Sequence, residues 1–181
     1  MELTKNKTQQ TFTALKEQFG YKNVMEAPRL VKVVISTGTG SLKEKEKIEL
    51  IPKRLATITG QAPAPRAAKK SIATFKLREG DKIGYQVTLR GKRMRDFLDV
   101  LLNVALPRTR DFQGLDPKGI DTMGNYTMGI GEHTIFPSVA DEELRNVFGF
   151  AVTIVTTAKT KDEARAFLEQ LGFPFKKEKS A

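Results

Sequence analysis

The chain has 181 residues, of which 31 are lysine or arginine and 21 are aspartate or glutamate, so its formal net charge is +10. It has no cysteine, which excludes disulfide bonds, thiolate metal sites and cysteine nucleophiles. The length suits a single domain spanning residues 1–181, and the positive charge favours a polyanionic partner such as a nucleic acid.

Residues 1–20 predict an N-terminal helix. Their first part, MELTKNKTQQTF, is polar and lacks the apolar core of a signal peptide. Phe12, Leu15 and Phe19 then recur at helical spacing, and Gly20 follows as a stop signal. No apolar run approaches the length of a membrane span, so we expect a cytoplasmic protein without a membrane partner.

A β-branched run from Arg29 to Gly40 predicts the first strand. Lys32, Val34 and Ser36 fall on one face of this strand, whereas Val31, Val33 and Ile35 fall on the other.

A second helix is predicted between Ser41 and Gly60. Ser41 and Glu44 form a capping box at its start. The apolar positions along its buried side are Ile48, Ile51, Leu55 and Ile58. Pro52 lies inside this helix, so it is expected to kink the helix or split it in two.

A charged hairpin is predicted next. Residues 61–65, QAPAP, form a stiff connector into it, and residues 78–82, REGDK, suit a solvated loop tip. Between positions 83 and 90, apolar and aromatic side chains alternate with Gly84, Gln86, Thr88 and Arg90. This period of two indicates a strand with one buried face.

Most of the net charge lies around this hairpin. From Arg66 to Arg95 there are ten basic and two acidic residues, a surplus of +8 in a chain whose net charge is +10. Lysine and arginine clustered around a strand and a loop are the electrostatic footprint of a polyanion partner. The alternative is an ordinary solvated basic face, because basic runs are common in proteins.

The hairpin leads into an amphipathic helix that Pro107 ends. The apolar positions of this helix are Met94, Phe97, Leu98, Leu101, Leu102 and Ala105. Asp96 and Asp99 are expected one turn apart on its outer face, where they pair with arginines or solvent rather than perform acid–base chemistry.

Residues 108–137 are rich in glycine, aspartate and proline, and they predict long loops around one weak strand. In that strand Tyr126, Met128 and Ile130 alternate with smaller residues. The interleaved aromatic side chains argue against disorder.

Residues 148–157 are the most apolar stretch and predict a central strand. Thr160 and Glu163 form a second capping box for a last helix, which Gly172 ends. Residues 176–181 are expected to be a frayed basic tail. The order of elements predicts an α+β fold, in which helices pack on one face of a mainly antiparallel sheet.

No arrangement typical of an enzyme is found. Gly38-x-Gly40 lacks the third glycine of a dinucleotide loop, since Lys43 occupies its place. His133 is the only histidine, is expected on the surface, and has no second histidine or cysteine with which to hold a metal. We therefore expect no catalysis, no cofactor and no metal site.

Many collinear blocks, spread over nearly the whole chain, resemble one family. They include Lys69-Lys70-Ser71-Ile72-Ala73, Phe75-Lys76-Leu77-Arg78-Glu79-Gly80, Val87-Thr88-Leu89-Arg90-Gly91, Gly124-Asn125-Tyr126-Thr127 and Gly172-Phe173-Pro174-Phe175. The chain resembles ribosomal protein five of the large subunit in its bacterial form, a family that binds 5S ribosomal RNA. The resemblance implies a structural protein docked on 5S RNA and other large-subunit RNA, near the transfer RNA of the peptidyl site.

The resemblance also implies particular RNA contacts. The family uses an asparagine at the end of the first strand, a glutamine after the second helix, and a threonine and an arginine on the hairpin strand. Ser36, Gln61, Thr88 and Arg90 occupy these positions here, so the first contact departs from the family pattern. A basic residue of the family is also replaced by Met123.

Three sets of contact residues follow from the charge and the resemblance together. Ribosomal RNA contacts are expected from Arg29, Lys32, Ser36, Gln61, Lys69, Lys70, Thr88 and Arg90. Contacts of the hairpin loop with transfer RNA are expected from Ser71, Phe75, Lys76, Arg78, Gly80 and Lys82. The acidic cluster Asp141, Glu142 and Glu143 is expected to cap a helix or to face a basic protein of the small-subunit head, because carboxylates repel phosphate.

Two alternatives remain open. A non-ribosomal RNA chaperone could use the same basic face, and a phosphotransferase or nuclease could use acidic helix residues such as Asp96. We expect no homo-oligomer.

Overall fold

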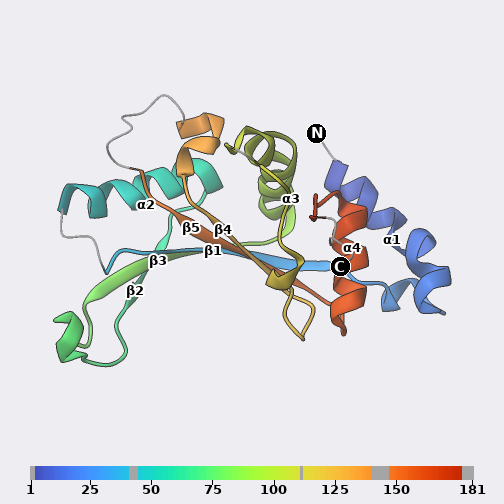
Figure 1. Ribbon diagram of the computed structural model, residues 1–181, viewed down its shortest axis with the longest axis horizontal. Coiled ribbons are helices and arrows are strands. Elements are labelled where there is room, and N and C mark those ends of the chain that lie inside the picture. Colours follow the sequence, from blue (N-terminus) through green and yellow to red (C-terminus); the bar gives the residue numbers. More distant parts are fainter. Residues whose placement is uncertain (1–2, 41–44, 111, 140–146, 177–181) are drawn as a thin grey trace. The chain divides into compact units, whose positions relative to one another are not determined.

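A computed structural model describes residues 3–40, 45–110, 112–139 and 147–176 (Figure 1). These residues form an α+β fold with four α-helices and a five-stranded sheet of order β2-β3-β1-β5-β4, which confirms the predicted fold class. The chain forms two compact units: unit 1 comprises Met1–Val33, Leu89–Met128 and Thr153–Ala181, and unit 2 comprises Val34–Thr88 and Gly129–Val152. That the chain folds as one domain stays a prediction.

Strand β1 (Leu30–Gly38) is the middle strand of the sheet. Strand β5 (Phe150–Thr156), which was expected to be central, lies between β1 and the edge strand β4 (Tyr126–Ile130). Along β1 the side chains of Val33 and Ile35 are fully buried, whereas Val31, on the same face near the start of the strand, is 42% exposed.

Two hydrogen bonds show that β1 and β5 are antiparallel. The backbone N–H of Arg29 donates to the hydroxyl of Thr157 at 2.8 Å, and the hydroxyl of Thr37 donates to the carbonyl of Gly149 at 2.8 Å. Moving forward along β1 therefore means moving backward along β5, as in an antiparallel pair.

The predicted hairpin is present as β2 (Ala64–Ala67) and β3 (Lys82–Leu89), which pair in antiparallel fashion. The connector expected at residues 61–65 is shorter than predicted, because Ala64 and Pro65 already belong to β2. Pro65 is tolerated there because β2 is an edge strand, in which a missing N–H donor breaks no ladder on the free side. Val87 and Leu89 are buried, as predicted.

Unit 2 contains helix α2 (Lys45–Thr59), which lies along one side of β1 and β3 (Figure 1). Pro52 does not split it: one helix runs through the proline although the proline supplies no N–H donor. Ile51 and Leu55, on either side of Pro52, are buried to 1% exposure or less, and we attribute the continuity of the helix to this packing. The predicted capping box at its start lies outside the described residues.

In unit 1, helix α1 (Leu3–Phe19) packs against α3 (Gly91–Val100) and α4 (Lys161–Leu171). The N-terminal helix is confirmed, with Leu15 buried. The predicted stripe of α4 is buried along its whole length: Ala164, Phe167, Leu168 and Leu171. The tail after residue 176 lies outside the described residues.

A hydrogen-bonded junction joins the end of α1 to the start of α4. The Tyr21 hydroxyl donates to the Glu163 carboxylate, which also accepts the N–H of Lys159 at 2.7 Å. Burial and the adjacent Glu163 carboxylate raise the pKa of Tyr21 above its ordinary value. The capping box predicted at the start of α4 is half correct. The Thr160 hydroxyl accepts the N–H of Glu163 as predicted, but the Glu163 carboxylate accepts the N–H of Lys159 and not that of Thr160.

The amphipathic helix after the hairpin changes type before Pro107. Helix α3 is followed by a π-helical turn (Leu101–Ala105) and then by a 3-10 turn (Leu106–Arg108). Asp99 is 5% exposed, so its predicted position on the outer face is wrong. Helix α3 is therefore also buried on the side that carries Asp99, which the apolar residues along its other face do not predict.

Candidate nucleic-acid interface

The polar face of strand β3 lies opposite its buried residues. Gln86 and Thr88 are half-buried and alternate with Val87 and Leu89, whose side chains are in the core. Ser36, on the neighbouring strand β1, is also half-buried and alternates with buried residues. These three polar side chains therefore occupy the less buried face of the sheet in unit 2.

Gln61 is fixed against this face by the end of helix α2. Gly60, with φ +66°, turns the chain after the helix, and the N–H of Gln61 donates to the Thr59 hydroxyl at 3.3 Å. The Gln61 side-chain amide then donates to the backbone carbonyl of Thr88 at 3.3 Å. Two of the predicted RNA contacts, Gln61 and Thr88, are thus brought together by a bond that leaves the Thr88 hydroxyl available.

Sequence reasoning did not select a further polar pair on the hairpin. The Nε–H of Arg66 donates to the side-chain oxygen of Gln86 at 2.6 Å, across strands β2 and β3. Arg66 was counted in the basic stretch, and Gln86 was placed on the polar face. Only the pairing register of the two strands, which the sequence does not give, brings them into contact.

The loop between β2 and β3 is held by its own hydrogen bonds. Ala68 donates to Asp81 at 2.8 Å and accepts from Gly80 at 3.1 Å. Ile72 and Leu77 exchange two backbone bonds of 3.0 and 3.2 Å. The tip was expected at residues 78–82, but the innermost turn lies at residues 73–76, and residues 78–82 form the exposed returning side of a small, hydrogen-bonded hairpin.

Two side chains strengthen this loop. The Ser71 hydroxyl accepts the backbone N–H of Glu79 at 2.9 Å, and the Asp81 carboxylate accepts the backbone N–H of Arg78 at 2.8 Å. Lys76 closes the innermost turn with φ 52°, a left-handed conformation that is uncommon outside glycine. Ser71 is thus a structural residue of the loop, whatever else it contacts.

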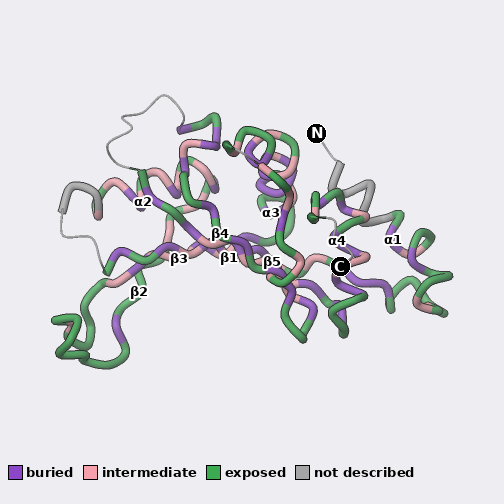
Figure 2. Tube along the Cα trace, viewed as in Figure 1, coloured by how far each residue is buried: buried purple, intermediate pink, exposed green. Residues whose placement is uncertain are grey.

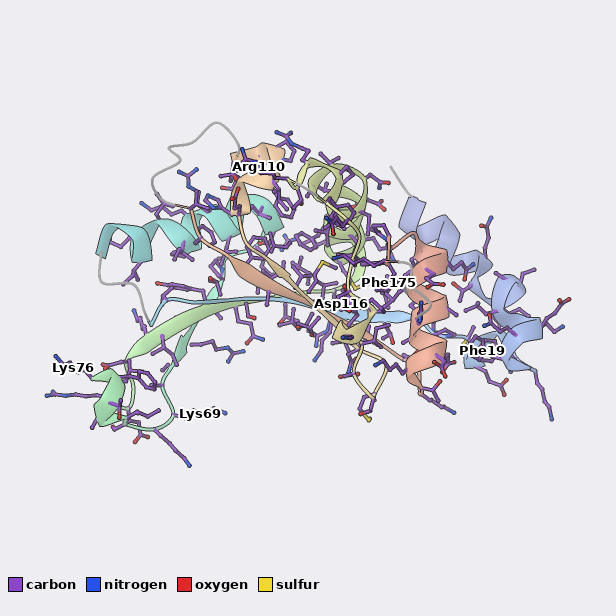
Figure 3. All side chains as sticks on the ribbon, viewed as in Figure 1. Phe19, Lys69, Lys76, Arg110, Asp116 and Phe175 are labelled. Carbon is purple, nitrogen blue, oxygen red and sulfur yellow. The ribbon has the colours of Figure 1, made fainter. Side chains whose placement is uncertain are left out.

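The loop between β2 and β3 is exposed along most of its length (Figure 2). Figure 3 shows the side chains of Lys69 and Lys76 pointing away from the hairpin. The exposed cations of this loop are Lys69, Lys70, Lys76, Arg78 and Lys82. Phe75 lies among them with 70% of its surface exposed, so the loop offers both charge and one aromatic ring to a partner.

Three predicted RNA contacts belong to unit 1. Arg29 is exposed just before β1, and Lys32 is half-buried within that strand. Arg90 is exposed and caps helix α3 with an extended backbone.

His133 does not lie on the surface, so that expectation is wrong. It is 2% exposed, stacks on Phe148 with ring centroids 4.3 Å apart, and its Nδ1 accepts the backbone N–H of Phe148 at 3.4 Å. Burial lowers the pKa of His133, and the positive charge of Arg54 lowers it further. A single histidine in a polar segment carried no signal of this burial.

The loop that carries Met123 is built on Asp121. One carboxylate oxygen of Asp121 accepts the backbone N–H groups of Met123 and Asn125 at 3.0 and 2.7 Å, and the other accepts the Asn125 side-chain amide. Burial by itself raises the pKa of Asp121, but these bonds bring it below its ordinary value. Met123, which is carried by this loop, is 70% exposed.

Among the described residues, no group of three His, Cys, Asp or Glu side chains could hold a metal ion. In the same residues, no helix is long and apolar enough to cross a membrane. The acidic cluster at positions 141–143 lies outside the described residues.

Comparison with known families decides the identity of the chain. Residues 23–78 match the family model described as ribosomal protein L5, and residues 82–175 match the model that describes the C-terminus of the same ribosomal family. The chain belongs to the ribosomal protein L5 family. The boundary between the two L5 matches falls in the hairpin, at the base of the loop.

Individual L5 relatives agree over most of their length. The large ribosomal subunit protein uL5 of Desulfotalea psychrophila is 51% identical over 171 residues, which cover 94% of this chain and 96% of that protein. The uL5 protein of Kocuria rhizophila is 52% identical over 174 residues, covering 95% and 92% respectively. That of Thermosipho melanesiensis is 49% identical over 166 residues, covering 91% of each chain.

Membership of the L5 family confirms the broad prediction. The chain is a structural, non-enzymatic and RNA-binding protein of the large ribosomal subunit. The enzyme alternative built on Asp96 is thereby excluded, and the expected localisation on the cytoplasmic ribosome is confirmed.

Proposed function

We propose that this large-subunit protein binds 5S ribosomal RNA through the polar face of its sheet and contacts peptidyl-site transfer RNA through the loop between β2 and β3. The observation that carries the proposal is the division of the hairpin into two parts. Its base presents half-buried polar side chains at fixed spacing, and its end presents exposed cations on a hydrogen-bonded loop.

The base of the hairpin suits one folded RNA. The Gln61 amide is tied to β3, and the spacing of a strand holds the Thr88 hydroxyl in a defined direction. Directional hydrogen bonds of this kind select a particular RNA surface, whereas phosphate contacts mainly supply affinity. Arg29, Lys32, Lys69, Lys70 and Arg90 supply that charge in the proposal, and Ser36 replaces the asparagine of the family.

The loop suits a partner that arrives and leaves. Its cations Lys76, Arg78 and Lys82 are exposed, so they meet phosphate with little desolvation. The bonds within the loop lower the ordering cost of each encounter, because the backbone needs no rearrangement. Transfer RNA is such a partner, since it must leave the peptidyl site in every elongation cycle.

The acidic cluster Asp141, Glu142 and Glu143 completes the proposal. Three adjacent carboxylates repel a phosphate backbone, and they attract a basic protein. The resemblance to the family favours a protein of the small-subunit head as that partner. An RNA backbone against these residues in the assembled ribosome would contradict this part.

Two filter-binding titrations with free 5S RNA test the division of the hairpin. Thr88→Val keeps the shape and the carbonyl that Gln61 uses, but it removes the hydroxyl and leaves an RNA group unpaired, at a cost of about 1 to 3 kcal/mol. Lys76→Glu combined with Arg78→Glu is expected to change 5S RNA binding little and to reduce transfer RNA retention on assembled ribosomes. Lys22→Glu combined with Lys118→Glu reverses the same charge elsewhere and serves as the control.

The result that would reverse the assignment is a larger loss of 5S RNA affinity in the loop variant than in Thr88→Val. Co-migration with large subunits after a moderate-salt wash separates the ribosomal protein from a free RNA chaperone. Weak, wash-sensitive association would favour the chaperone.

A further inference from the structure

The hairpin carries a polar pair that the proposed RNA contacts do not include. Across the two strands, Arg66 lies opposite Gly84 and Gln86 lies opposite Ala64. Because both opposing residues are small, the long side chains of Arg66 and Gln86 can meet along the diagonal of the strand pair. They do so through the 2.6 Å bond from Arg66 Nε to Gln86 Oε1.

A β-bulge lies beside this pair. Arg66 pairs with Gly84 but Ala67 pairs with Lys82, so Ile83 is an extra residue on β3. Bulges increase the local twist of a hairpin and redirect the neighbouring side chains. The bulge therefore separates the regular base of the hairpin, where Arg66 and Gln86 lie, from the loop.

The bond to Gln86 fixes which groups of Arg66 remain for a partner. Gln86 occupies Nε, which leaves the two terminal nitrogens of the guanidinium to bind two oxygens in parallel. Gln86 uses its oxygen in the bond, so its amide nitrogen adds further donors on the same side. In the described part of the chain no carboxylate is paired with Arg66.

Gln86 and Thr88 lie two positions apart on β3, so the pair shares the face that carries the Thr88 hydroxyl. Arg66 is exposed, whereas Gln86 is half-buried and thereby limited in its movement. The free groups of Arg66 and Gln86 are mainly N–H donors and one of the two side chains is positively charged, so this cluster favours an acceptor-rich and anionic ligand.

We infer that Arg66 binds a phosphate of the 5S ribosomal RNA and that Gln86 is a positioning residue that orients its guanidinium. The inference rests on the proposed function and extends the RNA-binding face from β3 to the edge strand β2. A phosphate fits better than a base edge, because it presents paired oxygens to the two terminal nitrogens and also neutralises the positive charge of the guanidinium.

The test is a salt titration of 5S RNA binding with the full chain. Arg66→Gln should weaken binding about tenfold and reduce the slope of log K against log salt by about 0.7 to 0.9, the value of one phosphate contact. Arg165→Gln removes the same charge from an arginine paired with Glu169 and should leave the slope unchanged. Circular dichroism of each variant checks that it folds.

Two further variants separate positioning from charge. Gln86→Met retains every charge, so it should weaken binding several-fold without changing the slope. Arg66→Lys should also weaken binding several-fold with an unchanged slope, because lysine keeps the charge but lacks the planar fork of the guanidinium. The double variant should be no weaker than Arg66→Lys alone, because both changes remove the same arrangement.

The outcomes distinguish this inference from the proposal beneath it. Failure of the unchanged chain to bind 5S RNA overturns the proposed function. If Thr88→Val weakens 5S RNA binding and Arg66→Gln does not, the inference about Arg66 is overturned and the proposed function stands. A weaker Arg66→Gln complex with an unchanged slope overturns the phosphate contact, and full affinity in Gln86→Met overturns the role of Gln86.

Discussion

At the scale of single residues, His133 links the stability of the chain to pH. Its pKa in the folded state is depressed by burial and by Arg54, whereas in the unfolded state it returns to about 6.5. A group whose pKa is lower in the folded state binds its proton more readily in the unfolded state. Its contribution to stability is therefore fully present above the pKa of the unfolded state, and it is lost as the pH falls toward and through the pKa of the folded state. Acidification below pH 6.5 should therefore destabilise the chain.

This prediction is tested with His133→Phe, which keeps a ring against Phe148 but cannot titrate. The unchanged chain should lose more free energy of unfolding than the variant between pH 7.5 and 5.5, by at most about 1.4 kcal/mol per pH unit. Urea unfolding at both pH values measures it. Parallel losses in the two proteins would show that His133 does not contribute, and the comparison is simple because the chain has no other histidine.

Residues also show what the sequence could and could not predict. Val33, Ile35, Val87 and Leu89 are in the core, because a period of two survives whatever the tertiary arrangement. The burial of His133 depends on segments far from it in the chain, which no local pattern encodes.

At the scale of elements, strand β3 approaches its neighbour β1 closely at one glycine. A Cβ at Gly84 would lie 2.6 Å from the backbone carbonyl oxygen of Thr37, which cannot move without displacing the sheet. Gly84→Ala should therefore reduce the free energy of unfolding by about 1 to 3 kcal/mol.

The matched control is Gly129→Ala in strand β4. No atom lies within 4 Å of a Cβ built there, and the backbone is not left-handed, so alanine should be neutral or slightly stabilising. Thermal or urea unfolding of both variants gives the comparison. Equal effects of the two substitutions would mean that the sheet yields at Gly84.

Elements were predicted better than their details. Strands β1, β3, β4 and β5 and the helices α1 to α4 follow from periodicity and from stop signals such as Gly20 and Gly172, both with positive φ, whereas the first half of β2 was expected to be a connector. The passage of α2 through Pro52 and the π-helical turn after α3 did not follow, because packing decides both. The pairing of Arg66 with Gln86 was missed for a related reason, since a bulge sets the register.

At the scale of the whole molecule, the net charge of +10 predicts salt-dependent RNA binding. Each phosphate contact should lower log K by about 0.7 to 0.9 per unit of log salt, because bound counterions are released. Titrations of 5S RNA at several salt concentrations measure the slope. A complex insensitive to salt would contradict a binding mode dominated by the basic stretch from Arg66 to Arg95.

For the candidate RNA-binding site, the sequence predicted the location but not the individual contacts. The charge surplus and the family blocks located the hairpin, and Gln61 and Thr88 are in contact there. Whether each residue touches RNA stays a prediction, because affinity and contact depend on the shape of a partner that this chain does not specify.

The edge position of β2 matters before the ribosome is assembled. A newly made chain spends time without RNA, and a free strand edge is a template on which other chains can grow into aggregates. Pro65 withholds one of the backbone donors that such growth needs, and Arg66 adds a charge beside it. We therefore expect the hairpin to resist self-association during that interval and to stay accessible to the RNA that we propose it binds.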